Sequence, residues 1–191
     1  LQTAESVQLT RATKTDEMGR ADWRPWQEEP NLRGVADYRS AINQARGTVV
    51  YFDGQQARQV DLLTLKDESL FEVPADRQVQ SQNCCSPDGK WFVYIVTPRG
   101  SRYGQRVQAD VTAYDFDRRE QRVLFTVDHA CHHVTMYDNE HFFAHHPPGH
   151  MGMCFGDLTS GTWRDLRSGD PGVQGEPCHS IATAHGIAYE V

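Results

Sequence analysis

The sequence predicts an all-β protein with the fold of a β-propeller, and three features of the chain lead to this prediction. Short runs rich in Val, Tyr, Phe and Thr are bounded by turns such as Asp53-Gly54, which is typical of strands and hairpins. The second run of each unit contains an aspartate, as at Asp61, Asp115 and Asp157. The unit recurs at roughly 40–50 residues, a period that indicates propeller blades.

The strands of these blades can be placed along the sequence in order. The first blade is predicted to use residues 47–52, 57–62 and 68–73. The second follows the turn Ser86-Pro87-Asp88-Gly89-Lys90 and uses residues 91–96, 111–116 and 121–125. The third is predicted over residues 140–145, 153–158 and 162–166, and a fourth opens at 185–191. Each such sheet leaves a face that only a neighbouring blade covers.

About four blades or parts of blades are therefore visible, and propellers close rings of about four to eight blades. We expect the chain to be part of a seven-bladed ring, completed by another chain or by a missing segment. Residues 1–46 are interpreted as a partial blade with a polar insertion, and residues 47–191 as the blades of an incomplete ring. Residues 35–45 are loosely amphipathic, which predicts a short helix there.

Composition restricts the classes of partner. The chain of 191 residues has 19 basic and 26 acidic side chains and a formal charge of −7, which argues against binding to nucleic acid. An acidic oligosaccharide remains a suitable partner, because it needs only a local basic pocket. No apolar run approaches the ~18–20 residues of a membrane helix. The five cysteines form no C-x-x-C pair, which favours a reducing, cytoplasmic location, although a periplasmic or secreted one is compatible.

The histidines are concentrated in one part of the chain. All nine lie between His129 and His185, close to the places where the chain enters or leaves the predicted strands of the third and fourth blades. The positions at which successive blades begin meet around the central channel of a propeller, so we expect these imidazoles to converge. Histidine serves both as a general base and as a metal ligand near neutral pH.

The order of these histidines resembles the central blades of oligogalacturonate lyases, which belong to the TolB-like propellers. The resemblance covers roughly residues 43–191. It is carried by His133 before a strand, His145-His146 directly after it and then a Pro-Gly turn, followed by Gly175-Glu176-Pro177-Cys178-His179 and an apolar strand. The stretches 60–65 and 71–74 are similar to the preceding blade of that family.

The resemblance implies a carbon-oxygen lyase of pectin degradation that cleaves oligogalacturonides by metal-assisted β-elimination, with a divalent metal, usually manganese. His133, or its neighbour His132, matches the catalytic base, and His179 matches the first metal ligand. Arg106 is the nearest candidate for the family's catalytic arginine, a few residues from the expected place. His132, His145 and His146 are the candidates for substrate binding. The family's other metal ligands, a Gln and two histidines, lie beyond the position that matches Val191.

Two other functions remain open at this point. One is a non-catalytic TolB-like propeller that binds a protein or glycan partner, since a propeller alone does not define a function. The other is a propeller that gates a peptidase, although the sequence has no Gly-x-Ser-x-Gly motif. The clustered histidines favour the lyase, because a purely interacting propeller has no need to gather imidazoles where blades begin.

Overall fold

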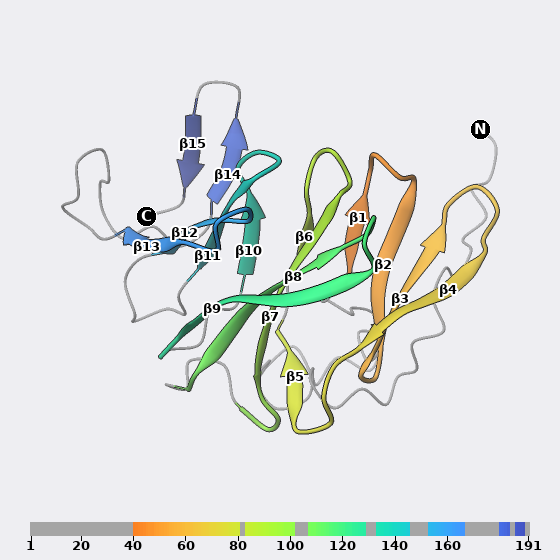
Figure 1. The fold of residues 1–191 in the computed structure, drawn as a ribbon. Helices are drawn as coiled ribbons and strands as arrows, with labels where there is room; N and C mark the ends of the chain where they lie inside the picture. The colour runs from red at the N-terminus through yellow and green to blue at the C-terminus, as the bar shows by residue number, and fades with distance from the viewer. Residues whose placement is uncertain are drawn as a thin grey trace, which may run out of the picture.

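The computed structural model describes residues 40–80, 83–101, 107–128, 133–145, 153–166, 180–183 and 186–189. All regular structure in these ranges consists of β-strands, without a helix. No helix in the described part of the chain is long and apolar enough to cross a membrane. The strands form four antiparallel sheets that follow one another along the chain (Figure 1).

The first blade is a four-stranded sheet in the order β1-β2-β3-β4. Its strands are β1 (Ala41–Asn43), β2 (Thr48–Asp53), β3 (Gln56–Asp61) and β4 (Asp67–Glu72). The expected helix over residues 35–45 is wrong for its described part, since β1 pairs with β2 from Ala41 opposite Val50 to Asn43 opposite Thr48. Pairing satisfies the backbone groups that a helix would otherwise satisfy internally, and it buries Ala41 and Asn43.

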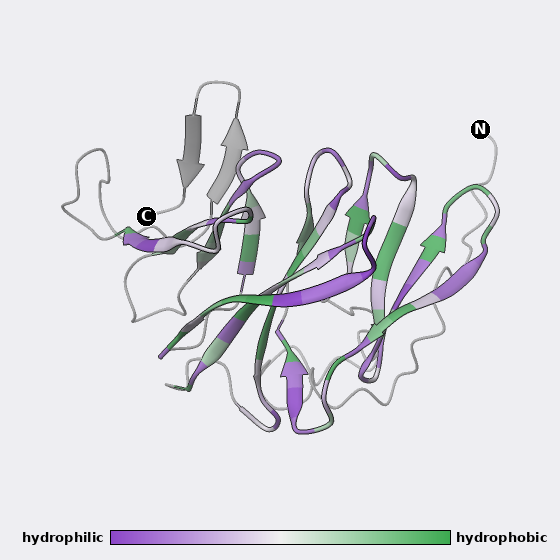
Figure 2. Ribbon diagram, in the orientation of Figure 1, coloured by the Kyte–Doolittle hydropathy of each residue, from purple (hydrophilic) through white to green (hydrophobic). Residues whose placement is uncertain are grey.

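The second blade contains an interrupted first strand. Both β5 (Arg77–Val79) and β6 (Cys84–Cys85) pair with β7 (Trp91–Pro98), β5 near its end and β6 near its beginning. The sheet continues with β8 (Ala109–Asp115) and β9 (Glu120–Val127). Figure 2 shows β9 hydrophilic over its first half, where the side chains are exposed.

The third blade has the order β10-β11-β12-β13, and a two-stranded sheet follows it. The strands of the third blade are β10 (His133–Met136), β11 (His141–His145), β12 (Met153–Asp157) and β13 (Trp163–Leu166). The final pair consists of β14 (Ser180–Thr183) and β15 (Gly186–Tyr189).

The first strands of successive blades lie next to one another. β1 contacts β6, β6 contacts β10, and β10 contacts β14. In Figure 1, β1, β10 and β14 also point in the same direction. The first strands are therefore the inner strands of a stack of blades, as expected for a propeller.

Two apolar clusters hold the blades together. The cluster between the first and second blades includes Phe52 and Phe92, and the cluster between the second and third includes Ile95 and Phe142. All four side chains are fully buried. Because alternate residues of a strand face opposite sides of the sheet, Cys84 packs on the second cluster and Cys85 on the first. Burial raises the pKa of the Cys84 thiol. It raises the pKa of the Cys85 thiol to about 12, so both thiols are structural rather than reactive groups.

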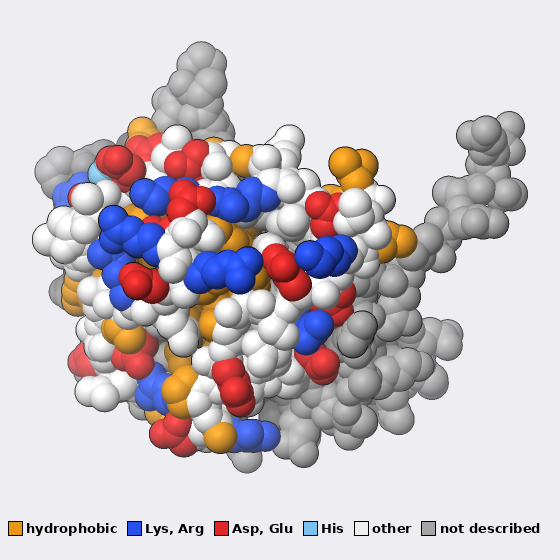
Figure 3. Space-filling view, turned by 45° about the vertical axis from the view of Figure 1, so that its right-hand side comes forward, with side chains coloured by type: hydrophobic (Ala, Val, Ile, Leu, Met, Phe, Trp, Pro, Cys, Tyr) orange, Lys and Arg blue, Asp and Glu red, His pale blue; other side chains and the backbone are white. Residues whose placement is uncertain are grey.

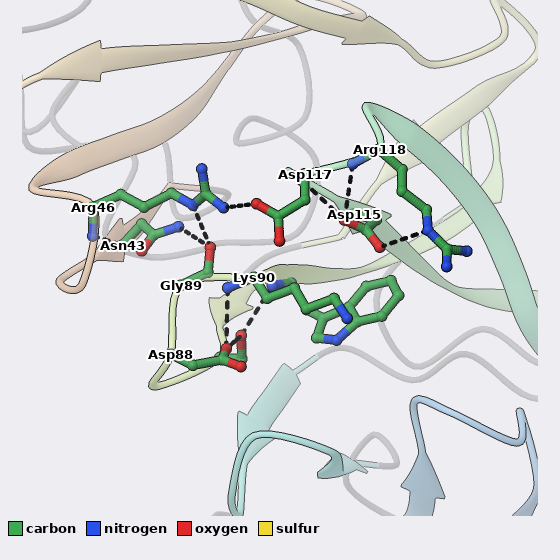
Figure 4. A network of polar contacts seen from close by, with 10 residues as sticks. Asn43, Arg46, Asp88, Gly89, Lys90, Asp115, Asp117 and Arg118 are labelled. Carbon is green, nitrogen blue, oxygen red and sulfur yellow. Dashed lines mark hydrogen bonds and ion pairs between the residues drawn. The ribbon is translucent and has the colours of Figure 1, made fainter.

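A ladder of polar contacts joins the blades at the end where the first strand of each blade turns into the second (Figure 4). Asn43 Nδ2 donates a hydrogen bond to the Gly89 carbonyl oxygen over 3.0 Å, and Arg46 bonds the same oxygen and Asp117. On the other side, the Asp88 backbone N–H donates to Asn139 of the third blade over 3.0 Å. Gly89 has a φ of +75°, and a Cβ there would lie 2.7 Å from Asn43 Oδ1. The predicted Asp88-Gly89 turn therefore also serves as the joint between blades.

The aspartate that recurs in each unit caps a turn at the same end of the blades. Oδ1 of Asp61 accepts hydrogen bonds from the backbone N–H groups of Leu63 and Thr64, and Oδ1 of Asp157 accepts from those of Thr159 and Ser160. Asp115 caps its turn in the same way. The hydrogen bonds from Thr64 and from Ser160 hold the pKa of Asp61 and of Asp157 below the usual value. The repeat seen in the sequence is thus a repeated turn.

Four residues after each capping aspartate, the backbone is left-handed. Leu65 has a φ of 56°, Arg119 of 57° and Gly161 of 69°. A left-handed backbone costs a residue with a Cβ about 1–2 kcal/mol, whereas glycine adopts it freely.

We therefore expect Leu65→Gly and Arg119→Gly each to raise the free energy of unfolding by about 0.5–1 kcal/mol, the strain relieved less the added chain entropy. Urea denaturation measures the change. The matched control is Lys66→Gly, beside Leu65 and also exposed but without a positive φ, which should lower stability. Destabilisation by all three substitutions would contradict the proposed strain.

Candidate functional site

Several described strand ends that are next to predicted site residues in sequence lie at one end of the blades, which we call the site edge. It is the end where β10 and β14 begin and where β11 finishes. The register sets His133, the first residue of β10, opposite His145, the last residue of β11. The beginning of β10 and the end of β11 therefore lie side by side. β14 runs beside β10 in the same direction (Figure 1). The strand ends that adjoin His132, His146 and His179 in sequence therefore all lie at the site edge.

His133 is the one predicted site residue whose side chain is described. It is 7% exposed, and the next residue, Val134, packs into the apolar cluster between the second and third blades. Alternation along β10 places His133 on the opposite face of the sheet from Val134. The histidine is therefore held at the beginning of an inner strand, on the face turned away from the second blade.

The strand register pairs His133 with a second predicted site residue. His133 and His145 are direct partners in the β10–β11 ladder, and Thr135 and Phe143 are the next pair on that face. His145 is in turn the partner of Met153 in β12. Phe143 and Met153 are 1% and 2% exposed. A buried apolar surface thus lies beside the histidine positions and would keep bulk water away from them.

The remaining predicted site residues lie outside the described residues. These are Arg106, His132, His146 and His179; of His145, only the backbone is described. Across the ranges that the structure describes, no three His, Cys, Asp or Glu side chains are grouped so that they could hold a metal ion. The roles assigned to these residues stay predictions.

His141 has a structural role at the opposite end of the third blade. Its Nδ1 lies 2.9 Å from Asp138 Oδ2, and its ring stacks on Phe155 with centroids 5.4 Å apart. Desolvation raises the pKa of the Asp138 carboxyl, but hydrogen bonds from Glu140 and His141 lower it. The net result is a pKa below the usual value. His141 therefore holds the turn between β10 and β11, away from the site edge.

The pairing of His133 with His145 is a feature that sequence reasoning missed. The signal was present, because the two histidines lie six positions on either side of Asn139, in the middle of the turn that joins β10 to β11. In an antiparallel hairpin, positions equidistant from the turn face each other. The four-residue strand β10 was itself not predicted. Without a predicted hairpin, the equal spacing of the two histidines from Asn139 could not be read as a strand pairing.

No family model matches the sequence, and no curated protein matches it. The fold is similar to solved structures. An oligogalacturonate lyase from Vibrio parahaemolyticus matches with a TM-score of 0.62 and 14% identity over 74% of this chain and 42% of that chain. An oligogalacturonate lyase in complex with manganese matches with a TM-score of 0.54 and 17% identity over 64% and 38%. A chain of a nidogen/laminin complex matches with a TM-score of 0.55 and 13% identity over 78% and 53%.

These likenesses and the stacked antiparallel sheets define the protein as an all-β β-propeller, as the sequence predicted. At 13–17% identity the similarity extends to the fold alone. The chain spans less than half the length of either lyase.

Proposed function

We propose that the protein is a lyase that cleaves oligogalacturonides by β-elimination. The observation that carries the proposal is the register of His133 with His145 at the start of an inner strand, in the only part of the sequence that contains histidine. The likeness in fold to two oligogalacturonate lyases supports the same choice.

The reaction requires a base beside a bound uronate. The base takes the proton from C5, a C4=C5 double bond forms, and the C4–O bond breaks so that the oxygen leaves with the other part of the sugar chain. In the proposal, His133 accepts the proton, because it is fixed by burial at the site edge, and positioned histidines are the commonest general bases. Arg106 pairs with the carboxylate of the uronate, whose developing charge must be stabilised. His132, His145 and His146 contact the sugar.

A divalent metal, probed as Mn²⁺, is part of the proposal. It would supply a positive charge that stabilises the carboxylate of the uronate as the C5 proton leaves. The described residues do not form a manganese site by themselves, since they group no three ligands, and Thr135 and Phe143, the next described pair on the face of His133, carry no carboxylate. The ligand that we propose, His179, lies outside the described residues.

We expect the folded protein, at its full native length, to raise the ultraviolet absorbance of an oligogalacturonate solution as unsaturated uronide accumulates. With Mn²⁺ the rise should be fast, and it should stop when a chelator removes the ion and resume when Mn²⁺ is returned. The same chain length tested on a neutral oligosaccharide is the control. A folded protein that gives no rise with Mn²⁺ on oligogalacturonate would exclude the lyase.

A second candidate is a propeller that binds a protein partner without catalysis. The turn between β3 and β4 exposes three leucines, with Leu63 94% and Leu65 51% exposed, and Asp61 holds this turn in shape. On the face that Figure 3 shows, basic and acidic side chains are interspersed. Exposed apolar groups on a fixed turn favour a protein contact. The absorbance assay separates the two functions, because only a lyase produces the unsaturated uronide.

A further inference from the structure

We infer that His133 and His145 form a cross-strand pair that binds an imidazole-preferring transition ion, with Cu²⁺ as the probe. The inference goes beyond the proposed function and does not depend on it. It rests on the direct pairing of the two residues in the β10–β11 ladder. Residues directly opposite each other in an antiparallel pair share a face and have Cβ atoms about 4.5–5.5 Å apart. Two histidines at such positions can ligate one ion together.

The surroundings of His133 favour a fixed geometry of its ring. His133 is 7% exposed, and the next pair on the same face is Thr135 with Phe143, of which Phe143 is 1% exposed. A buried imidazole has few rotamers open to it, so little conformational entropy is lost when it binds an ion. β10 is also held between β11 and the inner strands β6 and β14, which restrains the backbone of the pair.

The chemistry of the neighbouring positions selects the class of ion. The described same-face neighbours of the pair are Thr135, Phe143 and Met153, and none is a carboxylate. Imidazole suits Cu²⁺, Ni²⁺ and Zn²⁺, whereas Mn²⁺ prefers carboxylate and water ligands and binds more weakly at the same site. The pair should therefore bind Cu²⁺ more tightly than Mn²⁺.

The test is Cu²⁺ binding to the full chain without sugar, in competition with a weak chelator so that only the tightest site fills. We expect one tight site in the unmodified protein, and an affinity on the order of 100-fold lower in both His133→Gln and His145→Gln, because each loses one of the two ligands of the pair. His141→Gln is the matched control. It removes a histidine from the same hairpin that faces Asp157 and not another histidine, so the tight site should remain.

Electron spin-echo spectroscopy of Cu²⁺ bound to the unmodified protein tests the pair independently of any variant that fails to fold. Two coupled imidazoles are expected. A spectrum with one imidazole, a tight site that survives either substitution, or no tight site in the unmodified protein would overturn the pair. These outcomes leave the lyase proposal standing, since that proposal is judged by unsaturated product with Mn²⁺.

Discussion

Replacing Phe92 by alanine is expected to lower the free energy of unfolding by about 3–5 kcal/mol, the range for removing a buried aromatic ring. Phe92 is fully buried in β7. Its ring centroid lies 5.3 Å from that of Tyr94 in the same strand, 6.1 Å from that of Phe52 in β2 and 6.4 Å from that of Phe71 in β4. The substitution therefore leaves a cavity where the first blade packs on the second.

Chemical denaturation followed by tryptophan fluorescence measures this change. Val123→Ala is the control, because Val123 is 57% exposed in β9 of the same blade, and substitutions at such surface positions usually change stability by less than about 0.5 kcal/mol. If the blades unfolded independently, Phe92→Ala would split the denaturation curve into two transitions, and only one of them would be shifted. A single cooperative transition shifted to lower denaturant is expected instead, since the ring contacts cross the interface.

The second, third and fourth strands of the first three blades could be predicted from the sequence, whereas the first, inner strands could not. Residues 47–52 and 91–96 are rich in β-branched and aromatic residues, which predicts strands. The structure confirms these strands as β2 and β7. The inner strands β1, β6 and β10 have only two to four residues each and include polar ones such as Asn43 and His133. They are extended because a neighbouring strand satisfies their backbone groups, which is a tertiary effect that local composition does not encode.

The candidate site could be predicted as a set of histidines but not as a geometry. The concentration of imidazoles and their position where blades begin were visible in the sequence. The pairing of His133 with His145 depends on the length of the turn around Asn139 and on β10, which periodicity does not reveal. The recurring aspartate shows the same limit. Its repetition indicated blades, but its role as a turn cap at Asp61 and Asp157 became visible only from the hydrogen bonds in the structure.

Under the proposed lyase function, His133→Gln is expected to lower kcat/KM on oligogalacturonate by about 10²–10⁴-fold, the usual contribution of a general base. The loss should fall on kcat more than on KM, because proton transfer occurs in the transition state and not in substrate binding. Glutamine keeps a polar side chain of similar reach but cannot accept the C5 proton. Initial rates of unsaturated uronide formation measure the effect.

Two controls separate a loss of the base from a general disturbance of the third blade. His141→Gln alters the same blade at its other end, where His141 binds Asp138, and should leave the rate near that of the unmodified protein. Added imidazole should restore part of the rate to His133→Gln if the lost group is a base, because a small base can enter the space that the ring leaves. A variant that turns over substrate at the unmodified rate would assign the proton transfer to another residue. Since His133 is itself buried, the melting temperature must be measured on the same sample, so that a loss of folding is not counted as a loss of catalysis.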